Sequence, residues 1–482
     1  MDFVKALKNT QNFTHTENGA GTYTSSMSGV LDLFGLGGAY RTRSNNDCIT
    51  LFNKAWGEDC DLALKCLFYL RDVRGGQGER RFFRTVLHNL AITNPEVVRK
   101  NIRNIPEYGR WDDLYCLMDT PVEKNAFEFI GKQLSLDMSC KTPSLLAKWL
   151  KSENTSSKES RALGYKTRVA LGLTARTYRK MLSKLRANIN VLERLMSAQR
   201  WDEIEFDKIP SRAGLIYKNA FARHDVERYK AFAEDKNTKV NAKALYPYEV
   251  VHKVREFSRY NIKSTDRLML NKYWEGLADY IQNASFNGIV VADVSGSMYG
   301  TPIEVAISLA LMCAEKCSGP YHNHFLTFSR NPKLQAVIGD DIYDKVWNLD
   351  RADWDMNTDI EALFDLVLET AVMNCAKQED IPGTLIIVSD MEFDSCCYGS
   401  NRVETLMETM ERRWLRAGYK LPNLVFWNVN ARNDRVPMQV RKGITLVSGF
   451  SPVLFEQIIK GKTAWDLVLD KLLSERYKAV VA

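Results

Sequence analysis

The segment GIVVADVSGSM, residues 288–298, carries a run of apolar, β-branched residues that ends abruptly in polar ones. Such a run is typical of a buried strand in a parallel sheet. The next segment, TPIEVAISLALMCAEKC (301–317), has the length and apolar content of a packed helix, with proline in its first turn, where proline is tolerated. A buried strand followed directly by a helix is the unit from which open α/β sheets are built.

The same alternation continues to the end of the sequence. Further segments expected to form strands are HFLTF (324–328), TLIIVSD (384–390), NLVFWNV (423–429) and ITLVSG (444–449). Segments expected to form helices are 361–373, 403–418 and 453–461. Residues 286–482 are therefore predicted to form a doubly wound, mostly parallel sheet with helices on its faces.

The preceding residues show a different pattern. Between residues 48 and 285, apolar residues recur at three- and four-residue spacing, and strand-like alternation is nearly absent. This predicts an α-helical domain. Residues 109–114 and 199–204 both contain Arg-Trp-Asp followed by an acidic and an aliphatic residue, which favours a repeat of solenoid type, with chance similarity as the alternative. Residues 1–47 are expected to be an irregular segment that packs against something larger.

Formal charge is distributed unevenly along the 482 residues. Residues 1–280 carry 46 lysines and arginines against 33 aspartates and glutamates, a net charge of +13. The remaining residues carry 20 against 26, a net charge of −6, and the two sums give the overall +7. Residues 161–200 alone hold ten Lys or Arg and one Glu. The helical part is thus a candidate to bind nucleic acid, and a solvated or acidic-partner-facing basic surface is the alternative.

Oxygen-bearing side chains follow the first predicted strand of the α/β unit. In open α/β sheets, ligands bind beyond the carboxyl ends of the strands. Carboxylate and hydroxyl oxygens are hard ligands, suited to Mg²⁺ or Mn²⁺. A metal site that leaves a coordination position open to an acidic group of a partner is predicted, and the alternative is a metal-free turn in which an aspartate caps a helix. The predicted ligands are Asp293, Ser295, Ser297, Thr358 and Asp390.

Residues typical of catalysis do not accompany this motif. His322-Asn323-His324 leads directly into a predicted strand and lacks nuclease surroundings, and residues 75–78 (GGQG) lack the Lys-Ser/Thr of a phosphate-binding loop. No general base or activated nucleophile is recognisable beside the acidic residues. The chain is predicted to be non-enzymatic.

The sequence shows no features typical of a secreted or membrane-spanning protein. The N-terminus MDFVKALKNTQNF has no apolar core of signal-peptide length, and no stretch approaches the roughly 18 apolar residues of a membrane helix. The ten cysteines form no CxxC pair and are expected to be reduced thiols. A cytoplasmic protein without a membrane partner is expected.

The Asp-x-Ser-x-Ser motif, with Thr358 and Asp390 following in this order, resembles the metal-ion-dependent adhesion site of von Willebrand factor A (vWA) domains. A basic helical domain followed by such a domain resembles the TROVE/Ro ribonucleoprotein family, and more closely a Ro-related group of largely uncharacterised proteins. The resemblance covers nearly the whole chain and is carried by ENGA (17–20), RGG (74–76), GRWDDL (109–114), AKWL (147–150), MNTD (356–359) and SDMEFD (389–394).

This resemblance implies a HEAT-like solenoid or ring that is closed by contact with the vWA domain. It also implies binding of small structured RNA, because Ro proteins bind RNA ends in the ring and structured RNA on a basic outer surface. The chain is thus predicted to be a non-enzymatic, Ro-like RNA-binding protein whose vWA domain holds Mg²⁺ or Mn²⁺. The alternative is a metal-dependent protein-interaction module without RNA binding. The candidate RNA contacts are Arg74, Arg80, Arg81, Arg110, Lys166, Arg168, Arg176, Arg179, Lys180, Lys184 and Arg186.

Overall fold

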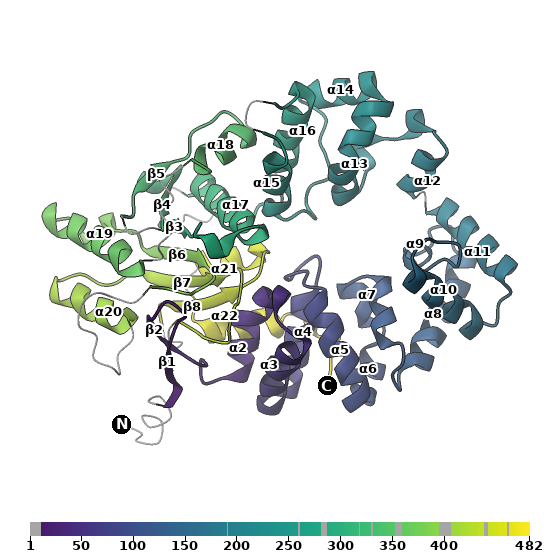
Figure 1. Ribbon diagram of the computed structural model, residues 1–482, viewed down its shortest axis with the longest axis horizontal. Helices are drawn as coiled ribbons and strands as arrows, with labels where there is room; N and C mark the ends of the chain where they lie inside the picture. The colour runs from purple at the N-terminus through teal and green to yellow at the C-terminus, as the bar shows by residue number, and fades with distance from the viewer. Residues whose placement is uncertain are drawn as a thin grey trace.

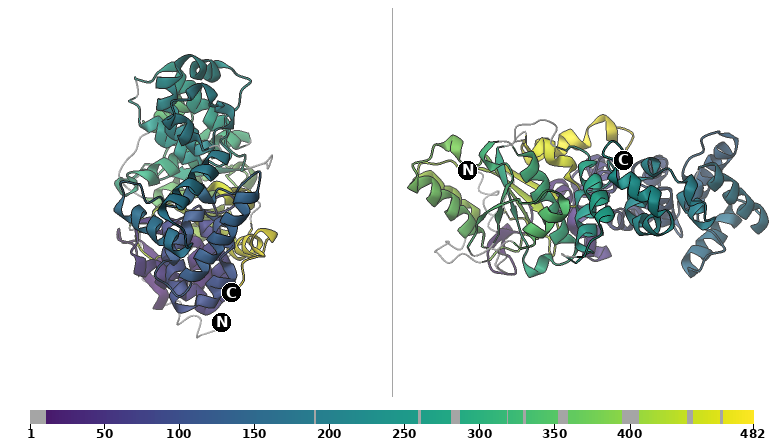
Figure 2. Two further views of the ribbon diagram at one scale, coloured as in Figure 1. Left: turned by 90° about the vertical axis from the view of Figure 1, so that its right-hand side faces the viewer. Right: turned by 90° about the horizontal axis from the view of Figure 1, so that it is seen from above.

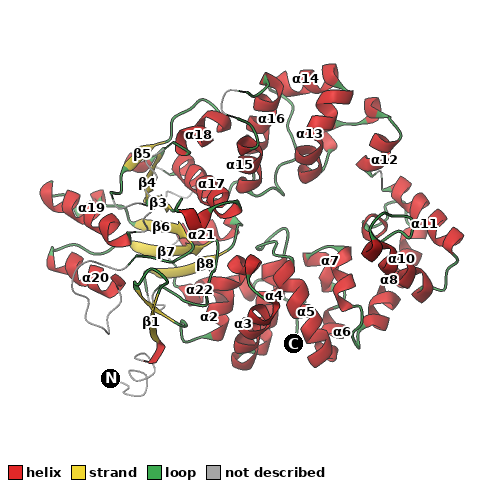
Figure 3. Cartoon of the chain, in the orientation of Figure 1, coloured by secondary structure: helices red, strands yellow, loops and turns green. Residues whose placement is uncertain are grey.

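The structure is a computed structural model that describes residues 11–189, 191–258, 261–280, 287–317, 319–328, 331–351, 359–394, 406–437, 442–459 and 462–482. The strands of the large sheet gather at one side of the molecule, and helices make up most of the remainder (Figure 3). The predicted ligand Thr358 lies outside the described residues.

The C-terminal α/β unit is built on a six-stranded sheet in the order β5-β4-β3-β6-β7-β8. Its neighbouring strands are parallel except β4 and β5, so the predicted mostly parallel sheet is confirmed. Every residue of β3, β6 and β8 is buried, which explains why these strands read as continuous apolar runs. The strands are β3 (Gly288–Ala292), β4 (His324–Thr327), β5 (Leu334–Ala336), β6 (Thr384–Ser389), β7 (Asn423–Asn428) and β8 (Ile444–Ser448).

Helices connect and cover these strands. The longest, α17, packs against β3, β4 and β6, and α22 packs against β8. The helices of the unit are α17 (Thr301–Lys316), α18 (Ile342–Leu349), α19 (Ile360–Met373), α20 (Leu406–Arg416), α21 (Phe455–Ile459) and α22 (Ala464–Leu472). None of the helices in the described ranges has both the length and the apolar character needed to cross a bilayer.

The N-terminal half is the predicted helical array. Its helices are α3 (Asn45–Glu58), α4 (Cys60–Arg71), α5 (Arg81–Thr93), α6 (Pro95–Asn101), α7 (Asn104–Tyr108), α8 (Glu123–Ser139), α9 (Leu146–Trp149), α10 (Lys158–Ala170), α11 (Ala175–Asn188), α12 (Leu192–Ser197), α13 (Ser211–His224), α14 (Val226–Glu234), α15 (Pro247–Arg255) and α16 (Ser264–Glu275). The two Arg-Trp-Asp segments both lead into 3₁₀ turns, Trp111–Leu117 and Trp201–Glu203.

Both ends of the array meet the α/β unit, so the chain closes into a ring (Figure 1). At the start of the array, α4 contacts α22. At its end, α15 packs on α17 and α16 packs on α18. Figure 2 shows the ring from its edge and from above, where it is flatter than in the face-on view.

The N-terminal segment differs from the irregular structure expected for residues 1–47. It contains the hairpin β1 (Phe13–His15) and β2 (Gly21–Tyr23), and the helix α2 (Gly29–Leu36). Gly38, just after α2, lies so close to β8 that a Cβ atom there would be 2.8 Å from the Ser448 carbonyl oxygen. The glycines in this segment therefore permit close packing on the sheet.

The last residues of the chain return to the helical array. The Asp72 carboxylate is fully buried and accepts hydrogen bonds from the Arg476 guanidinium and, at 2.9 Å, from the Tyr477 hydroxyl. The Asn101 side chain donates to the Val481 carbonyl at 2.6 Å. Burial acts to raise the pKa of Asp72, but the hydrogen bonds from Arg476 and from backbone N–H groups outweigh it and lower the pKa.

A second buried carboxylate explains the Gly-Arg-Trp-Asp-Asp segment at 109–114. Asp113 Oδ2 accepts hydrogen bonds from Arg71 Nε and from the Arg110 N–H, each at 2.8 Å. Its Oδ1 accepts from Arg84 Nε at 2.6 Å. Since Arg71 and Asp113 are both essentially inaccessible to water, this cluster joins α4, α5 and the following 3₁₀ turn through a desolvated ion pair.

Replacing Asp113 with alanine should lower the free energy of unfolding by about 3–5 kcal/mol, because the Arg71 guanidinium would remain buried without its partner. Urea denaturation followed by circular dichroism measures the change. Asp61→Ala is the matched control: Asp61 forms a surface ion pair with Lys65, so its loss should cost less than about 1 kcal/mol. Equal effects of the two substitutions would contradict the assigned role of Asp113.

Candidate functional site

Asp293 lies at the tip of β3, where the sheet ends. Its side chain is fully buried, and its N–H donates to the Val388 carbonyl of the neighbouring strand β6 at 3.0 Å. One carboxylate oxygen accepts the Ser295 N–H at 2.8 Å, and the other accepts the Ser389 hydroxyl at 2.6 Å. The carboxylate is therefore held in one orientation by the turn after β3 and by the end of β6.

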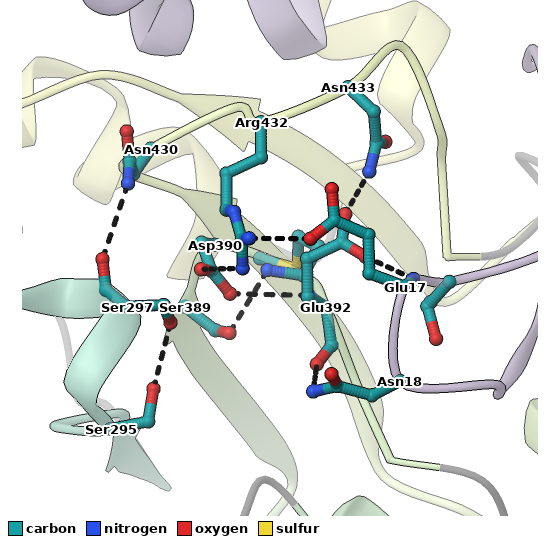
Figure 4. A network of polar contacts seen from close by, with 12 residues as sticks. Glu17, Asn18, Ser295, Ser297, Ser389, Asp390, Glu392, Asn430, Arg432 and Asn433 are labelled. Atoms are coloured by element: carbon teal, nitrogen blue, oxygen red, sulfur yellow. Dashed lines mark hydrogen bonds and ion pairs between the residues drawn. The ribbon is translucent and has the colours of Figure 1, made fainter.

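The two serines of the motif lie side by side (Figure 4). Ser295 Oγ and Ser297 Oγ are 3.1 Å apart, Ser295 is buried, and Ser297 is exposed. Two adjacent ligands of an octahedral Mg²⁺, each at about 2.0–2.1 Å, are about 3 Å from each other. The hydroxyl pair thus has the spacing that one such ion requires.

Asp390, at the end of β6, supplies the second carboxylate. It is 2% exposed, and its Oδ1 accepts the Glu392 N–H at 3.2 Å. Within the described residues, its Oδ2 is buried and has no hydrogen-bond partner. The nearest cationic atom is Arg432 Nη1 at 3.9 Å, beyond hydrogen-bonding distance (Figure 4). A buried carboxylate oxygen without a donor is costly unless a cation or water satisfies it.

Two buried carboxylates at one strand edge also affect each other. Burial, and then the charge of Asp390, raise the pKa of Asp293 to about 6. Burial likewise raises the pKa of Asp390. Both shifts mean that the charged forms lack sufficient stabilisation from the protein itself.

The residues present fit a hard divalent cation. Asp293, Asp390, Ser295 and Ser297 converge, whereas the structure gives no position for Thr358. Among the described residues, no three carboxylate, imidazole or thiol side chains form a metal-binding group. A cation here would depend on two carboxylates, hydroxyls and water, as Mg²⁺ does in proteins.

Arginine side chains line two adjoining cavities of the helical array. One cavity of about 680 Å³ and another of about 400 Å³ share Arg110, Arg212 and Val73 in their walls. Arg110 begins a 3₁₀ turn after α7, and Arg212 lies in the first turn of α13, so the two sides of the ring face each other here. Other arginines lining the cavities are Arg41, Arg71, Arg74, Arg80, Arg81 and Arg103.

Arg110 has an unusual environment. Its guanidinium lies 4.8 Å from the ring centroid of Trp149, and no carboxylate of the described residues forms an ion pair with it. Burial, and then the charges of Arg212 and Arg71, lower the pKa of Arg110. Arg71 pairs with Asp113 and Arg212 pairs with Glu249, so Arg110 differs from these neighbours in having no carboxylate partner among the described residues.

The predicted RNA contacts divide into three groups. Arg74, Arg80, Arg81 and Arg110 line the inner cavities. Arg176, Arg179, Lys180 and Lys184 are exposed on α11. The other three form hydrogen bonds within the protein. Lys166 donates to Asp119 and Glu123, and Arg168 donates to Glu153. Arg186 donates to the carbonyls of Ala147 and Leu150.

Sequence reasoning missed several residues of these sites. Arg212 and Trp149 belong to no motif with a known binding role. Arg432 follows the end of β7, so the rule that ligands bind beyond strand ends could have found it. Ser389 could have been found in the same way, because it directly precedes Asp390.

Magnesium should raise the thermal midpoint of the protein at about pH 7.5, and the increase should shrink as the pH falls through about 6, because Asp293 must be ionised to hold the cation. Scanning fluorimetry with and without Mg²⁺ measures this.

Since the pKa of Asp293 is higher in the folded than in the unfolded protein, its ionised form costs stability without metal. Asp293→Asn should therefore be the more stable form near pH 7.5 without Mg²⁺, with the difference fading toward about pH 4. An Mg²⁺-dependent increase that Asp293→Asn retains would contradict the site.

The chain matches two family models. The model described as Domain of unknown function (DUF2828) matches residues 16–136 and 131–285, and Domain of unknown function (DUF7788) matches residues 287–472. The chain is 33% identical over 500 residues to Uncharacterized protein L728 of Acanthamoeba polyphaga mimivirus, and the match covers 94% of this chain and 85% of that protein.

Among solved structures, the chain is similar to the crystal structure of the Deinococcus radiodurans Ro (RSR) protein. The sequence identity is 12%, the TM-score is 0.37, and the match covers 92% of each chain. At this TM-score the likeness is coarse, and membership of the TROVE/Ro and vWA families stays a prediction. The α/β unit matches the DUF7788 model, and the chain belongs to the DUF2828 family.

Proposed function

We propose that the protein is a non-enzymatic RNA-binding protein that holds a single-stranded part of a small structured RNA in the arginine-lined cavities inside its ring. The observation that carries this proposal is the Arg110 guanidinium, which lies at the junction of both cavities without a carboxylate partner among the described residues. A phosphate group is the ligand that would satisfy a partly buried arginine with like-charged neighbours.

The balance of charge in the cavities supports a polyanion. The smaller cavity is lined by six arginines and two glutamates, and the larger by four arginines and one glutamate. Glu79 pairs with Arg41, Glu249 with Arg212, Asp113 with Arg71 and Glu107 with Arg74. Among the described residues, no acidic side chain forms an ion pair with Arg80, Arg103 or Arg110, so the acids neutralise only part of this charge. Backbone phosphates supply most of the non-specific affinity of nucleic-acid-binding proteins.

Aromatic side chains stand among these arginines. Trp111 and Trp149 line the larger cavity, and Tyr246 and Tyr248 line the smaller one. Single-stranded RNA is recognised by stacking of bases on aromatic rings and arginine planes, together with phosphate contacts. This combination favours unpaired RNA over duplex within the cavities.

The exposed face of α11 is the second part of the proposed RNA surface. Arg176, Arg179, Lys180 and Lys184 lie on this one helix, and no acidic side chain of the described residues forms an ion pair with them. A solvated basic face suits the backbone of a folded RNA, whose recognition depends on shape and phosphates.

Metal-dependent binding of an acidic protein segment is a second candidate function. It is favoured by Asp390 Oδ2, which accepts no hydrogen bond from the described residues, and by the Ser295–Ser297 hydroxyl pair, which together suit Mg²⁺ or Mn²⁺. A cation held by two carboxylates and hydroxyls keeps positions for water or for a carboxylate from outside. The two functions can coexist, since the inner cavities and the β3–β6 edge are formed by different residues.

The double variant Arg110→Gln/Arg212→Gln should bind single-stranded RNA more weakly than the native protein. Its log affinity should also depend less steeply on log salt, by about 0.7 for each phosphate that the variant no longer neutralises. Fluorescence anisotropy with a labelled oligonucleotide across a salt series measures both quantities.

The matched control is Lys208→Gln/Lys230→Gln, which removes two positive charges from exposed side chains outside the cavities. It should keep nearly native affinity and slope. If both double variants bind RNA equally weakly, the binding reflects net charge alone and the assignment to the cavities is wrong.

For the second candidate, retention of the protein on an array of immobilised acidic peptides should require Mg²⁺ and should be abolished by a chelator or by Asp293→Asn. Ser389→Ala keeps both acidic ligands and is expected to weaken retention less. Retention that neither chelator nor Asp293→Asn reduces would rule out metal-mediated binding.

A further inference from the structure

We propose that Glu17 is an internal carboxylate ligand of the metal site, and that Arg432 holds its place while no cation is bound. The inference rests on the metal site proposed at Asp293 and Asp390 and assigns to it a ligand from the opposite end of the chain. The N-terminal segment would then close the site from within the same molecule.

The contacts of Arg432 carry the argument. Its Nη2 is 2.5 Å from Glu17 Oε2, and its Nη1 is 3.9 Å from Asp390 Oδ2. Figure 4 shows the guanidinium between the two carboxylates. The positively charged Arg432 thus lies between Asp390, at the end of β6, and Glu17, in the N-terminal segment.

Arg432 satisfies Asp390 poorly. The separation of 3.9 Å is too long for a hydrogen bond, and Asp390 Oδ2 accepts no hydrogen bond from the described part of the chain. Elsewhere in the protein, buried aspartates hold arginine at hydrogen-bonding distance, as Asp113 does with Arg71 at 2.8 Å. Arg432 is therefore a weak counterion for Asp390, and a divalent ion would replace it with a larger local charge.

The backbone around Glu17 is fixed on both sides, whereas its side chain is about half exposed. The Thr16 hydroxyl donates to the Phe393 carbonyl at 2.7 Å, and the Asn18 side-chain amide donates to the Glu392 carbonyl at 2.8 Å. The Glu17 N–H itself donates to a Glu392 carboxylate oxygen at 2.7 Å. Because the backbone is held on both sides, the Glu17 carboxylate would move from Arg432 to a cation by side-chain rotation, and little conformational entropy would be lost.

Glu392 follows Asp390 closely in the chain, but we do not expect it to be a ligand of the cation. Its carboxylate already accepts the Glu17 N–H and a hydrogen bond from Asn433, and it lies 3.7 Å from Arg435. These contacts make it the anchor of the N-terminal segment. Glu17 instead has a single ion pair in the described structure, to Arg432, and exchanging that partner breaks no other ion pair of its side chain there.

An internal carboxylate ligand would compete with the acidic group of any partner. A partner must then displace Glu17, whose effective concentration at the site is high because the segment is tethered on both sides. The N-terminal segment would therefore raise the concentration of partner needed for metal-dependent binding.

Manganese titration of the full chain by isothermal calorimetry tests the proposal, with Glu17→Gln, Arg432→Gln and Asp293→Asn as variants. Glu17→Gln should weaken Mn²⁺ binding about tenfold through loss of one charged ligand, and Arg432→Gln should tighten it through loss of the competing cation. Asp434→Asn removes one carboxylate that lies two positions from Arg432 in the chain, pairs with Arg43 and accepts a hydrogen bond from the Tyr40 hydroxyl. Asparagine keeps an oxygen acceptor for Tyr40, so this variant controls for the loss of one negative charge.

Hydrogen exchange of residues 11–24 gives a second readout. Mn²⁺ should increase protection of these amides in the native protein but not in Glu17→Gln. If Glu17→Gln binds Mn²⁺ as tightly as the native protein, or no more weakly than Asp434→Asn, the internal ligand is ruled out while the metal site stands. If Asp293→Asn binds Mn²⁺ like the native protein, the proposed metal site is ruled out, and with it the proposal that Glu17 is its internal ligand.

Discussion

A carboxylate withdrawn from water has to keep a cation or several hydrogen-bond donors beside it, and this requirement shapes the molecule at three places. Asp72 meets it with Arg476 and Tyr477, about 400 residues further along the chain, and thereby ties the chain end to the helical array. Asp113 meets it with Arg71 and Arg84, and so joins neighbouring helices.

The third place is the edge of the sheet, where Asp293 and Asp390 are equally buried but the same requirement is not met. The Ser389 hydroxyl and the Ser295 N–H donate to Asp293, and Asp390 keeps one oxygen without a hydrogen-bond donor in the described structure. The contrast with Asp72 and Asp113 separates a structural carboxylate from a candidate ligand. A buried carboxylate needs a cation or hydrogen-bond donors in all three places, and the places differ in how many of these the protein supplies.

The fold of the α/β unit could be predicted because burial on both sides leaves a local signature. Strands such as β3 and β6 are buried at every position, and the residues at their tips are then placed by topology alone. The inner cavities could not be predicted in this way. Arg110 and Arg212 are 102 positions apart and share a cavity wall because the helices between them bring the chain back on itself. Composition alone also cannot separate Arg186, which donates to backbone carbonyls, from exposed Arg179 on the same helix.

The docking of α2 against β8 has a consequence for how the chain is made. Its contacts join residues more than 400 positions apart, such as Ser448 and the Phe34 carbonyl. At about 5–20 residues per second, a ribosome needs roughly 20–80 s to reach β8 after α2 has emerged. During that interval the apolar face of α2 has no sheet to cover it. The nascent chain must therefore shelter α2 on its helical neighbours or on a chaperone until the last strands are made.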